Sequence, residues 1–120
     1  FPAGLVEPGE AMTDAAVREF HEETGLHLKV IPADDMYTKP RFTTVGMTDE
    51  ACGMIYGYAS GVPDNRFEES SEDIQVVLAD KKEVRRILKE ENVAMMCAYM
   101  LLHFLKSEGD PLGFVEMQEK

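Results

Sequence analysis

Cysteine is scarce in this sequence, and its two cysteines, Cys52 and Cys97, are too far apart to match the spacing of a metal-binding motif. One pair of cysteines in 120 residues does not build the disulfide framework of a small secreted domain. We therefore expect two reduced thiols in the core of a cytoplasmic protein.

Basic residues are also few. The chain has 12 Lys and Arg but 23 Asp and Glu, which gives a formal charge of −11. A field of this sign repels nucleic acids and anionic membranes, so we expect neither as a partner, and an anionic ligand would require a bound cation. No apolar run reaches the roughly 18 residues of a membrane span, and the first residues lack the layout of a signal peptide. The absence of a Gly-rich loop ending in Gly-Lys-Ser/Thr disfavours a phosphate-loop nucleotidase.

Three helices are predicted, over residues 13–24, 81–91 and 93–106. Thr13, Asp80 and Asn92 are expected to cap their first turns, and Gly25 is placed where a left-handed residue ends the first helix. Strands are predicted over residues 27–31, 36–45, 52–60 and 74–79, the second interrupted by Pro40 and the last the clearest. This order predicts one α+β domain over residues 1–120, with helices covering a mostly non-parallel sheet.

The final predicted helix is apolar on nearly every face, so we expect it to be deeply buried or packed against a second subunit. Its apolar side chains include Met95, Met96, Met100, Leu101, Leu102 and Phe104. Such a surface would fit a homodimer, and it keeps open the alternative of a structural or interaction domain. Met-rich packing at helical spacing is, however, more often core.

Three glutamates share one face of the first predicted helix. Glu19, Glu22 and Glu23 stand at positions i, i+3 and i+4, so they fall within an arc of about 100°. A like-charged pair near 4 Å costs on the order of 4 kcal/mol at an effective dielectric of 20, and a divalent cation would remove that cost. Oxygen ligands without cysteine favour Mg²⁺, while Glu-rich faces are otherwise commonly just solvated. His21 lies on the other side of the helix and is not counted as a ligand.

The context of these glutamates resembles the Nudix box over 23 residues. The box positions are Gly4, Glu10, Arg18, Glu19, Phe20, Glu22, Glu23, Gly25 and Leu26. With a usage of about 7% per residue type, seven fixed positions agree by chance about once in 10⁸ trials. The resemblance implies an α/β/α sandwich with a mixed sheet and a loop-helix-loop unit that holds Mg²⁺ or Mn²⁺.

Carried over position by position, the resemblance makes Glu19, Glu22 and Glu23 metal ligands, with the carbonyl of Gly4 as a further one. Glu10 and Arg18 would form a supporting ion pair that fixes the loop to the helix. On the opposite side, Ala15, Ala16 and Phe20 are expected to face the core.

Metal ions that bridge a diphosphate neutralise its charge and lower the pKa of a bound water, so the resemblance implies a hydrolase. We expect Glu22 and Glu23 to be catalytic through the metal, and Glu50 in the loop 43–53 to orient or deprotonate the water. Glu50 as an ordinary loop acid remains equally open.

Outside the box the chain is similar to the ADP-ribose pyrophosphatase branch of the Nudix hydrolases. The segments PAGLVEPGE, VGMTDE and EDIQVVLAD and the position of Pro40, 15 residues after Gly25 (40 − 25), carry this similarity. That Pro40 only ends a strand is equally open. The expected reaction converts ADP-ribose to AMP and ribose 5-phosphate. Another nucleotide sugar, a nucleoside triphosphate, or a non-catalytic nucleotide-binding module remain as alternatives.

Two points about the substrate region stay open. Tyr37, Phe42 and Tyr56 could stack on a base, but each lies in a strand-like stretch where core packing is the commoner role. Only three residues precede Gly4, whereas the resemblance implies strands before the box. We therefore expect an incomplete sheet with an open or covered edge near residues 1–4.

Overall fold

The computed structural model describes residues 1–64 and 75–115, which fall into two compact units. The box unit spans residues 1–76 and the residues from 115 onward, and the helical unit spans Val77–Phe114. The elements, in chain order, are α1 (Met12–Thr24), β1 (His27–Val30), α2 (Asp35–Thr38), β2 (Arg41–Phe42), β3 (Ala51–Cys52), β4 (Gly57–Ser60), α3 (Lys81–Glu90), α4 (Met95–Lys106) and the 3-10 helix η1 (Gly113–Val115).

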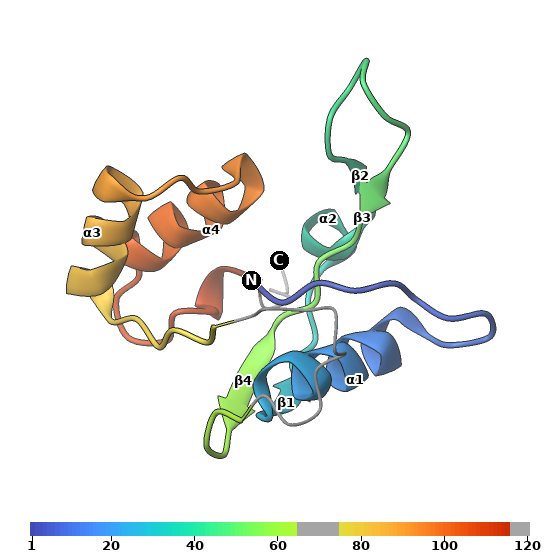
Figure 1. Cartoon of the computed structure of the whole chain (residues 1–120), viewed down its shortest axis with the longest axis horizontal. Coiled ribbons are helices and arrows are strands. Elements are labelled where there is room, and N and C mark those ends of the chain that lie inside the picture. The colour runs from blue at the N-terminus through green and yellow to red at the C-terminus, as the bar shows by residue number, and fades with distance from the viewer. Residues whose placement is uncertain (65–74, 116–120) are drawn as a thin grey trace, which may run out of the picture. The chain divides into compact units, whose positions relative to one another are not determined.

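The box unit confirms the α+β class. Its described strands form two antiparallel pairs, β1 with β4 and β2 with β3. In the first pair His27 lies opposite Ser60 and Val30 opposite Gly57, and helix α1 packs against β1 (Figure 1). Residues 1–4 belong to neither of the described sheets, and the expected incomplete sheet near them stays a prediction.

Helix α1 begins at Met12, with Ala11 as its N-cap and no capping side chain, so the prediction that Thr13 caps it was wrong. Its end follows the prediction, because Gly25 adopts φ = 74° and donates its N–H to the carbonyl of His21. Only glycine takes this left-handed conformation at little cost. The position of Gly25 therefore fixes where the glutamate-bearing helix stops.

The prediction of strands over 36–45 was largely wrong. The Asp34 side chain accepts a hydrogen bond from the N–H of Met36 and thereby caps the short helix α2, which leaves only β2 as strand. Aspartate competes well for such backbone donors, which favours a turn over an extended strand. The predicted strand over 52–60 also divides, because its two ends pair with different partners in the two sheets.

The strand prediction over 74–79 was wrong for residues 75–79, which form no strand, while residue 74 lies outside the described residues. Val77 and Leu78 are exposed there. A β-strand requires a neighbour that accepts its hydrogen bonds, and no described segment pairs with these residues. High β-propensity alone was therefore not sufficient.

In the helical unit, α3 contacts α4. Asp80 caps α3 as predicted, since its side chain accepts from the N–H of Glu83. The prediction for Asn92 was wrong, because α4 begins only at Met95, with Ala94 as an N-cap that makes no side-chain bond. The Lys81 ammonium donates to the carbonyl of Ser107 and so joins the two helices.

The core of each unit is small. Ala15, Leu26, Tyr56 and Val115 are buried in the box unit, and Val84 is buried in the helical unit. Ala15 thus faces the core as predicted, whereas Ala16 and Phe20 are half-buried.

Cys52 and Cys97 are free thiols but only half-buried, so the expectation of core thiols holds in part. No helix among the described residues is long and apolar enough to cross a membrane.

Candidate functional site

Helix α1 presents the three glutamates next to the loop that precedes it. Glu19 and Glu22 are half-buried, whereas Glu23 is 5% exposed and its carboxylate accepts the N–H of Ala3 at 3.2 Å. A Cβ placed on Gly4 would overlap the Glu19 carboxylate, so the backbone of Gly4 lies directly against that side chain. A side chain at this position would therefore displace the carboxylate of Glu19 from where it lies.

Arg18 is the centre of the polar contacts at this site. Its Nε and Nη2 donate to the two carboxylate oxygens of Glu10, both at 2.9 Å, in the bidentate geometry that makes such pairs strong. Its Nη1 donates to Glu19 at 2.9 Å and to Glu22 at 3.4 Å. One guanidinium thus contacts three of the predicted site residues.

The loop and the helix are tied together through this network. Arg18 Nη2 also donates to the carbonyl of Leu5 at 3.1 Å, and the Glu10 carboxylate accepts the N–H of Glu7 at 3.1 Å. The predicted ion pair between Glu10 and Arg18 is therefore present, with side chains 17% and 27% exposed. Its effect is to hold residues 5–10 against α1.

The electrostatics follow from these contacts. The hydrogen bond from Arg18 lowers the pKa of Glu10 from its ordinary 4.5 to about 2, and the N–H of Glu7 adds to this effect. The same carboxylate, followed by Glu19, raises the pKa of Arg18. Glu10 is therefore ionised and Arg18 charged at neutral pH.

Comparison with known proteins bears directly on this arrangement. The family model described as NUDIX domain matches residues 1–100, which include the whole loop and helix described above. The chain belongs to the Nudix family. The fold and the resemblance at residues 4–26 agree with this assignment.

Two curated Nudix-type relatives are similar to parts of the chain. "Putative nudix hydrolase 2" of Caenorhabditis elegans is 35% identical over 86 residues, which cover 67% of this chain and 37% of the relative. "Putative 8-oxo-dGTP diphosphatase" of Bacillus subtilis (strain 168) is 44% identical over 41 residues, which cover 34% of this chain and 28% of the relative. The chain thus spans well under half of the length of either. No solved structure gives a significant match.

The donor chemistry of the Nudix box fits a hard divalent cation. Glu19, Glu22 and Glu23 offer carboxylate oxygens on one helix, and the backbone of Gly4 lies against Glu19. Mg²⁺ and Mn²⁺ prefer such oxygens. Within residues 1–64 and 75–115, however, no three acidic, histidine or cysteine side chains converge as a ready metal cage. Arg18 and the N–H of Ala3 hold the glutamates instead.

Glu50 lies in the β2–β3 hairpin, and its described contacts stay within that hairpin. Its carbonyl accepts the N–H of Thr43 at 3.1 Å, its own N–H donates to Thr48, and its carboxylate accepts the thiol of Cys52 at 3.7 Å. Burial, together with the charge of Glu50, raises the pKa of Cys52. The structure thus gives no described contact between Glu50 and the box glutamates.

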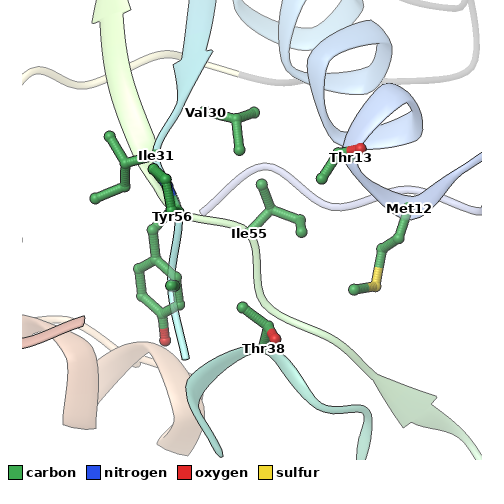
Figure 2. Close-up of a pocket in the computed structure, with 9 residues that line it drawn as sticks. Met12, Thr13, Val30, Ile31, Thr38, Ile55 and Tyr56 are labelled. Atoms are coloured by element: carbon green, nitrogen blue, oxygen red, sulfur yellow. The ribbon is translucent and has the colours of Figure 1, made fainter. Parts of the chain in front are cut away.

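An open cleft of about 410 Å³ lies beside the start of α1. Figure 2 shows Met12 and Thr13 of α1 on one side of it and Ile31 and Tyr56 on the other. The box glutamates are not among its lining residues, so it is distinct from the carboxylate face.

The three aromatic candidates for base stacking differ in position. Tyr56 is buried, and its hydroxyl donates to the carbonyl of Tyr37 at 3.3 Å, which matches the core role considered for it. Burial raises its pKa. Phe42 is 66% exposed, whereas Tyr37 is half-buried. Of the three, Phe42 has the ring most accessible to a ligand.

His21 stays apart from the carboxylates. Its ring stacks on that of His27 with centroids 4.9 Å apart, and its Nδ1 lies 3.3 Å from the carbonyl of Leu26. These contacts lie at the C-terminal end of α1.

Sequence reasoning missed several contacts that shape this site. The backbone groups of Ala3 and Leu5 bind Glu23 and Arg18, and no side-chain pattern could have indicated them. Thr24, which is buried, caps the end of α1, because its hydroxyl donates to Phe20 at 2.6 Å and accepts from Leu26 at 3.0 Å. The Arg18–Glu22 contact had a signal in the sequence, namely its i,i+4 spacing.

Proposed function

We propose that this chain carries the metal-binding part of a Nudix pyrophosphohydrolase, which hydrolyses the diphosphate linkage of a nucleoside diphosphate derivative. The observation that carries the proposal is the set of three glutamates on one face of α1, packed against Gly4 and Arg18. An interaction domain would have no need of so many carboxylates beside one another, because their mutual repulsion destabilises the helix.

The proposed roles follow the resemblance to the Nudix box. Glu19, Glu22, Glu23 and the carbonyl of Gly4 would hold Mg²⁺ or Mn²⁺. When bound, such an ion neutralises charge on the diphosphate and acidifies a bound water.

Arg18 and Glu10 position the loop and the helix relative to each other, since their bidentate ion pair links the two segments. They would act on the reaction only through the glutamates they hold. Glu50 is proposed to orient or deprotonate the attacking water, which requires its hairpin to approach the box when substrate binds. A loss of turnover below tenfold in Glu50→Gln would contradict this role.

ADP-ribose is the proposed substrate, and AMP and ribose 5-phosphate are the proposed products. The similarity of residues 2–10 and 45–50 and the position of Pro40 to the ADP-ribose pyrophosphatase branch support this choice. The second candidate is a nucleoside triphosphate. The name of the Bacillus subtilis relative, "Putative 8-oxo-dGTP diphosphatase", favours it.

A substrate screen of the complete protein separates these candidates. ADP-ribose, nucleotide sugars, dinucleoside polyphosphates and nucleoside triphosphates are each incubated with Mg²⁺, and the products are identified by mass. AMP with ribose 5-phosphate supports ADP-ribose, and a nucleoside monophosphate with pyrophosphate supports the triphosphate. Tight nucleotide binding without turnover of any compound would favour a non-catalytic module.

We further propose a cytoplasmic homodimer. The free thiols of Cys52 and Cys97 fit a reducing compartment. Met95, Tyr99 and Leu102 on α4 are 76%, 63% and 45% exposed, and a second copy would cover such an apolar surface. Light scattering coupled to size exclusion measures the mass directly, and a monomer at micromolar concentration would contradict the dimer.

A further inference from the structure

The guanidinium of Arg18 has two ends that contact different parts of the site. Nε and Nη2 bind Glu10, and Nη2 also binds the carbonyl of Leu5. Nη1 points the other way and binds the carboxylates of Glu19 and Glu22, at 2.9 and 3.4 Å. The first end ties the loop to α1, whereas the second end contacts only residues of the carboxylate face.

Nη1 occupies carboxylates that are proposed to bind the metal ion, those of Glu19 and Glu22. A guanidinium cannot be deprotonated in a protein, so it remains a cation at every relevant pH. Carboxylate oxygens engaged by Nη1 are less available to another cation, and two positive charges at the same oxygens repel each other. A divalent ion that binds the same two oxygens, Oε1 of Glu19 and Oε2 of Glu22, therefore competes with Nη1.

We propose that Arg18 is a resident cation that exchanges with the divalent ion. Before the metal binds, Nη1 neutralises Glu19 and Glu22 and holds their side chains near their ligating positions. On metal binding Nη1 releases both carboxylates, while Nε and Nη2 stay on Glu10 and keep the loop attached. The inference rests on the proposed metal-binding function of these glutamates.

Two observations support such an exchange. The anchor on Glu10 is bidentate and does not involve the proposed ligands, so it can persist when Nη1 leaves. The Arg18 side chain is 27% exposed, so it is not locked in a closed interior.

The proposal makes a prediction opposite to that of a purely structural role. If Arg18 only ties the loop to α1, its removal loosens the glutamates and weakens metal binding. If Nη1 competes with the metal, its removal frees Glu19 and Glu22, and metal binding becomes tighter. The sign of the change therefore separates the two roles.

The experiment measures Mn²⁺ binding to the complete protein by electron paramagnetic resonance of free Mn²⁺. Arg18→Gln is expected to lower the Kd for Mn²⁺ by roughly threefold to tenfold, since, of the three ion pairs that it removes, two partly exposed ones engage the proposed ligands Glu19 and Glu22. Lys29→Gln is the matched control, because it removes one positive charge from an exposed position of β1. Its Kd is expected to stay within about twofold of wild type, because an exposed charge is screened by salt and no described ion pair joins Lys29 to the glutamates.

A second variant covers the case in which Arg18→Gln does not fold. Arg18→Lys keeps the charge but lacks the planar fork, so it cannot bind Glu10 and both other glutamates together. We expect a smaller decrease in Kd for this variant. A Kd that is unchanged or raised in the folded Arg18 variants, or lowered equally by Lys29→Gln, overturns the exchange.

The variant Glu22→Gln separates two outcomes: a failure of the Arg18 exchange alone, and a failure of the proposed metal-binding function. A Kd for Mn²⁺ raised about tenfold or more in Glu22→Gln supports the metal site, whatever the Arg18 variants do. An unchanged Kd in Glu22→Gln would show that the metal does not bind at this face of α1. It would overturn the proposed function and the exchange together.

Discussion

Helices α1 and α4 have nearly the same length, 13 and 12 residues, but they are held in opposite ways. Helix α1 carries many charged side chains, yet three of its residues, Ala15, Glu23 and Thr24, are buried. Helix α4 is mostly apolar, yet none of its residues is buried. The more polar helix is thus the more firmly embedded in its own unit.

The difference shows where the fold of this chain depends on polar contacts. Arg18 and Gly25 tie α1 to its loop and define its end. Helix α4 contacts α3 and receives the Lys81 ammonium near its end, while Met95 and Tyr99 remain exposed. Helix α1 is thus fixed within its unit by polar contacts, whereas the helical unit leaves apolar side chains of α4 exposed.

The largest expected effect comes from exchanging a carboxylate on α1 for an amide. Glu22→Gln removes a proposed metal ligand, so we expect turnover of the complete protein to fall by about a hundredfold or more. Glu108→Gln, which makes the same change at an exposed position after α4, is expected to leave turnover within about twofold. Steady-state rates with saturating Mg²⁺ provide the measurement. Equal losses in both variants would mean that charge alone, rather than this face of α1, matters.

Next in size is the effect of a methyl group at the end of α1. Gly25 has φ = 74° and its added Cβ would overlap the backbone of Asp64, so Gly25→Ala combines conformational strain with a clash. We expect a loss of about 3 kcal/mol in the free energy of unfolding. Gly46→Ala, at φ = 86° with nothing within 4 Å, should cost only about 1 kcal/mol. Urea unfolding of both variants tests this, and equal costs would show that Asp64 does not restrict the turn.

A smaller effect is expected in the helical unit. Val84 on α3 is 2% exposed, so Val84→Ala should cost roughly 1–2 kcal/mol of stability through lost burial and a small cavity. Met95→Gln on α4 changes a side chain that is 76% exposed and should alter stability by less than about 0.5 kcal/mol. Thermal unfolding at low protein concentration compares the two. A large loss in Met95→Gln would indicate that the face of α4 is already covered.

The smallest effect concerns acid stability. Because Glu10 has a pKa of about 2 in the folded chain and 4.5 ordinarily, its ion pair with Arg18 stabilises the fold fully above about pH 4.5. This contribution is lost as the pH falls toward 2. Glu10→Gln should therefore flatten the loss of stability between pH 4.5 and 2.

Glu83 in α3 provides the comparison for this pH effect. The hydrogen bond from Arg86 lowers the pKa of Glu83, so Glu83→Gln should act in the same direction. Urea midpoints measured from pH 6 to pH 2 check both variants. A steeper acid limb in Glu10→Gln than in wild type would contradict the assigned ion pair.

The sequence predicted the helices and the family well, for identifiable reasons. Gly25 and Asp80 act through local backbone chemistry, and both ended or capped a helix as expected. The spacing of the box residues identified the family, because each box position requires a particular residue type that can be read directly from the sequence. The ion pair of Glu10 and Arg18 was expected from the same resemblance and is present. The metal roles of Glu19, Glu22 and Glu23 stay predictions.

The strands could not be predicted in the same way, because a strand depends on a partner that local sequence does not reveal. Residues 75–79 have strong β-propensity but no described pairing segment. Residues 35–38 form a helical turn because the Asp34 side chain accepts a hydrogen bond from the N–H of Met36. The contacts of Ala3 and Leu5 were equally hidden, since they use only backbone groups.

The central claim is that the glutamates of α1 bind a divalent ion for diphosphate hydrolysis. The most direct measurement is the Mg²⁺ dependence of ADP-ribose hydrolysis by the complete protein, compared with the protein in which Glu22 and Glu23 are both replaced by Gln. We expect Mg²⁺-dependent release of AMP by the wild type and almost none by the double variant at any Mg²⁺ concentration. Undiminished release by a folded double variant would contradict it.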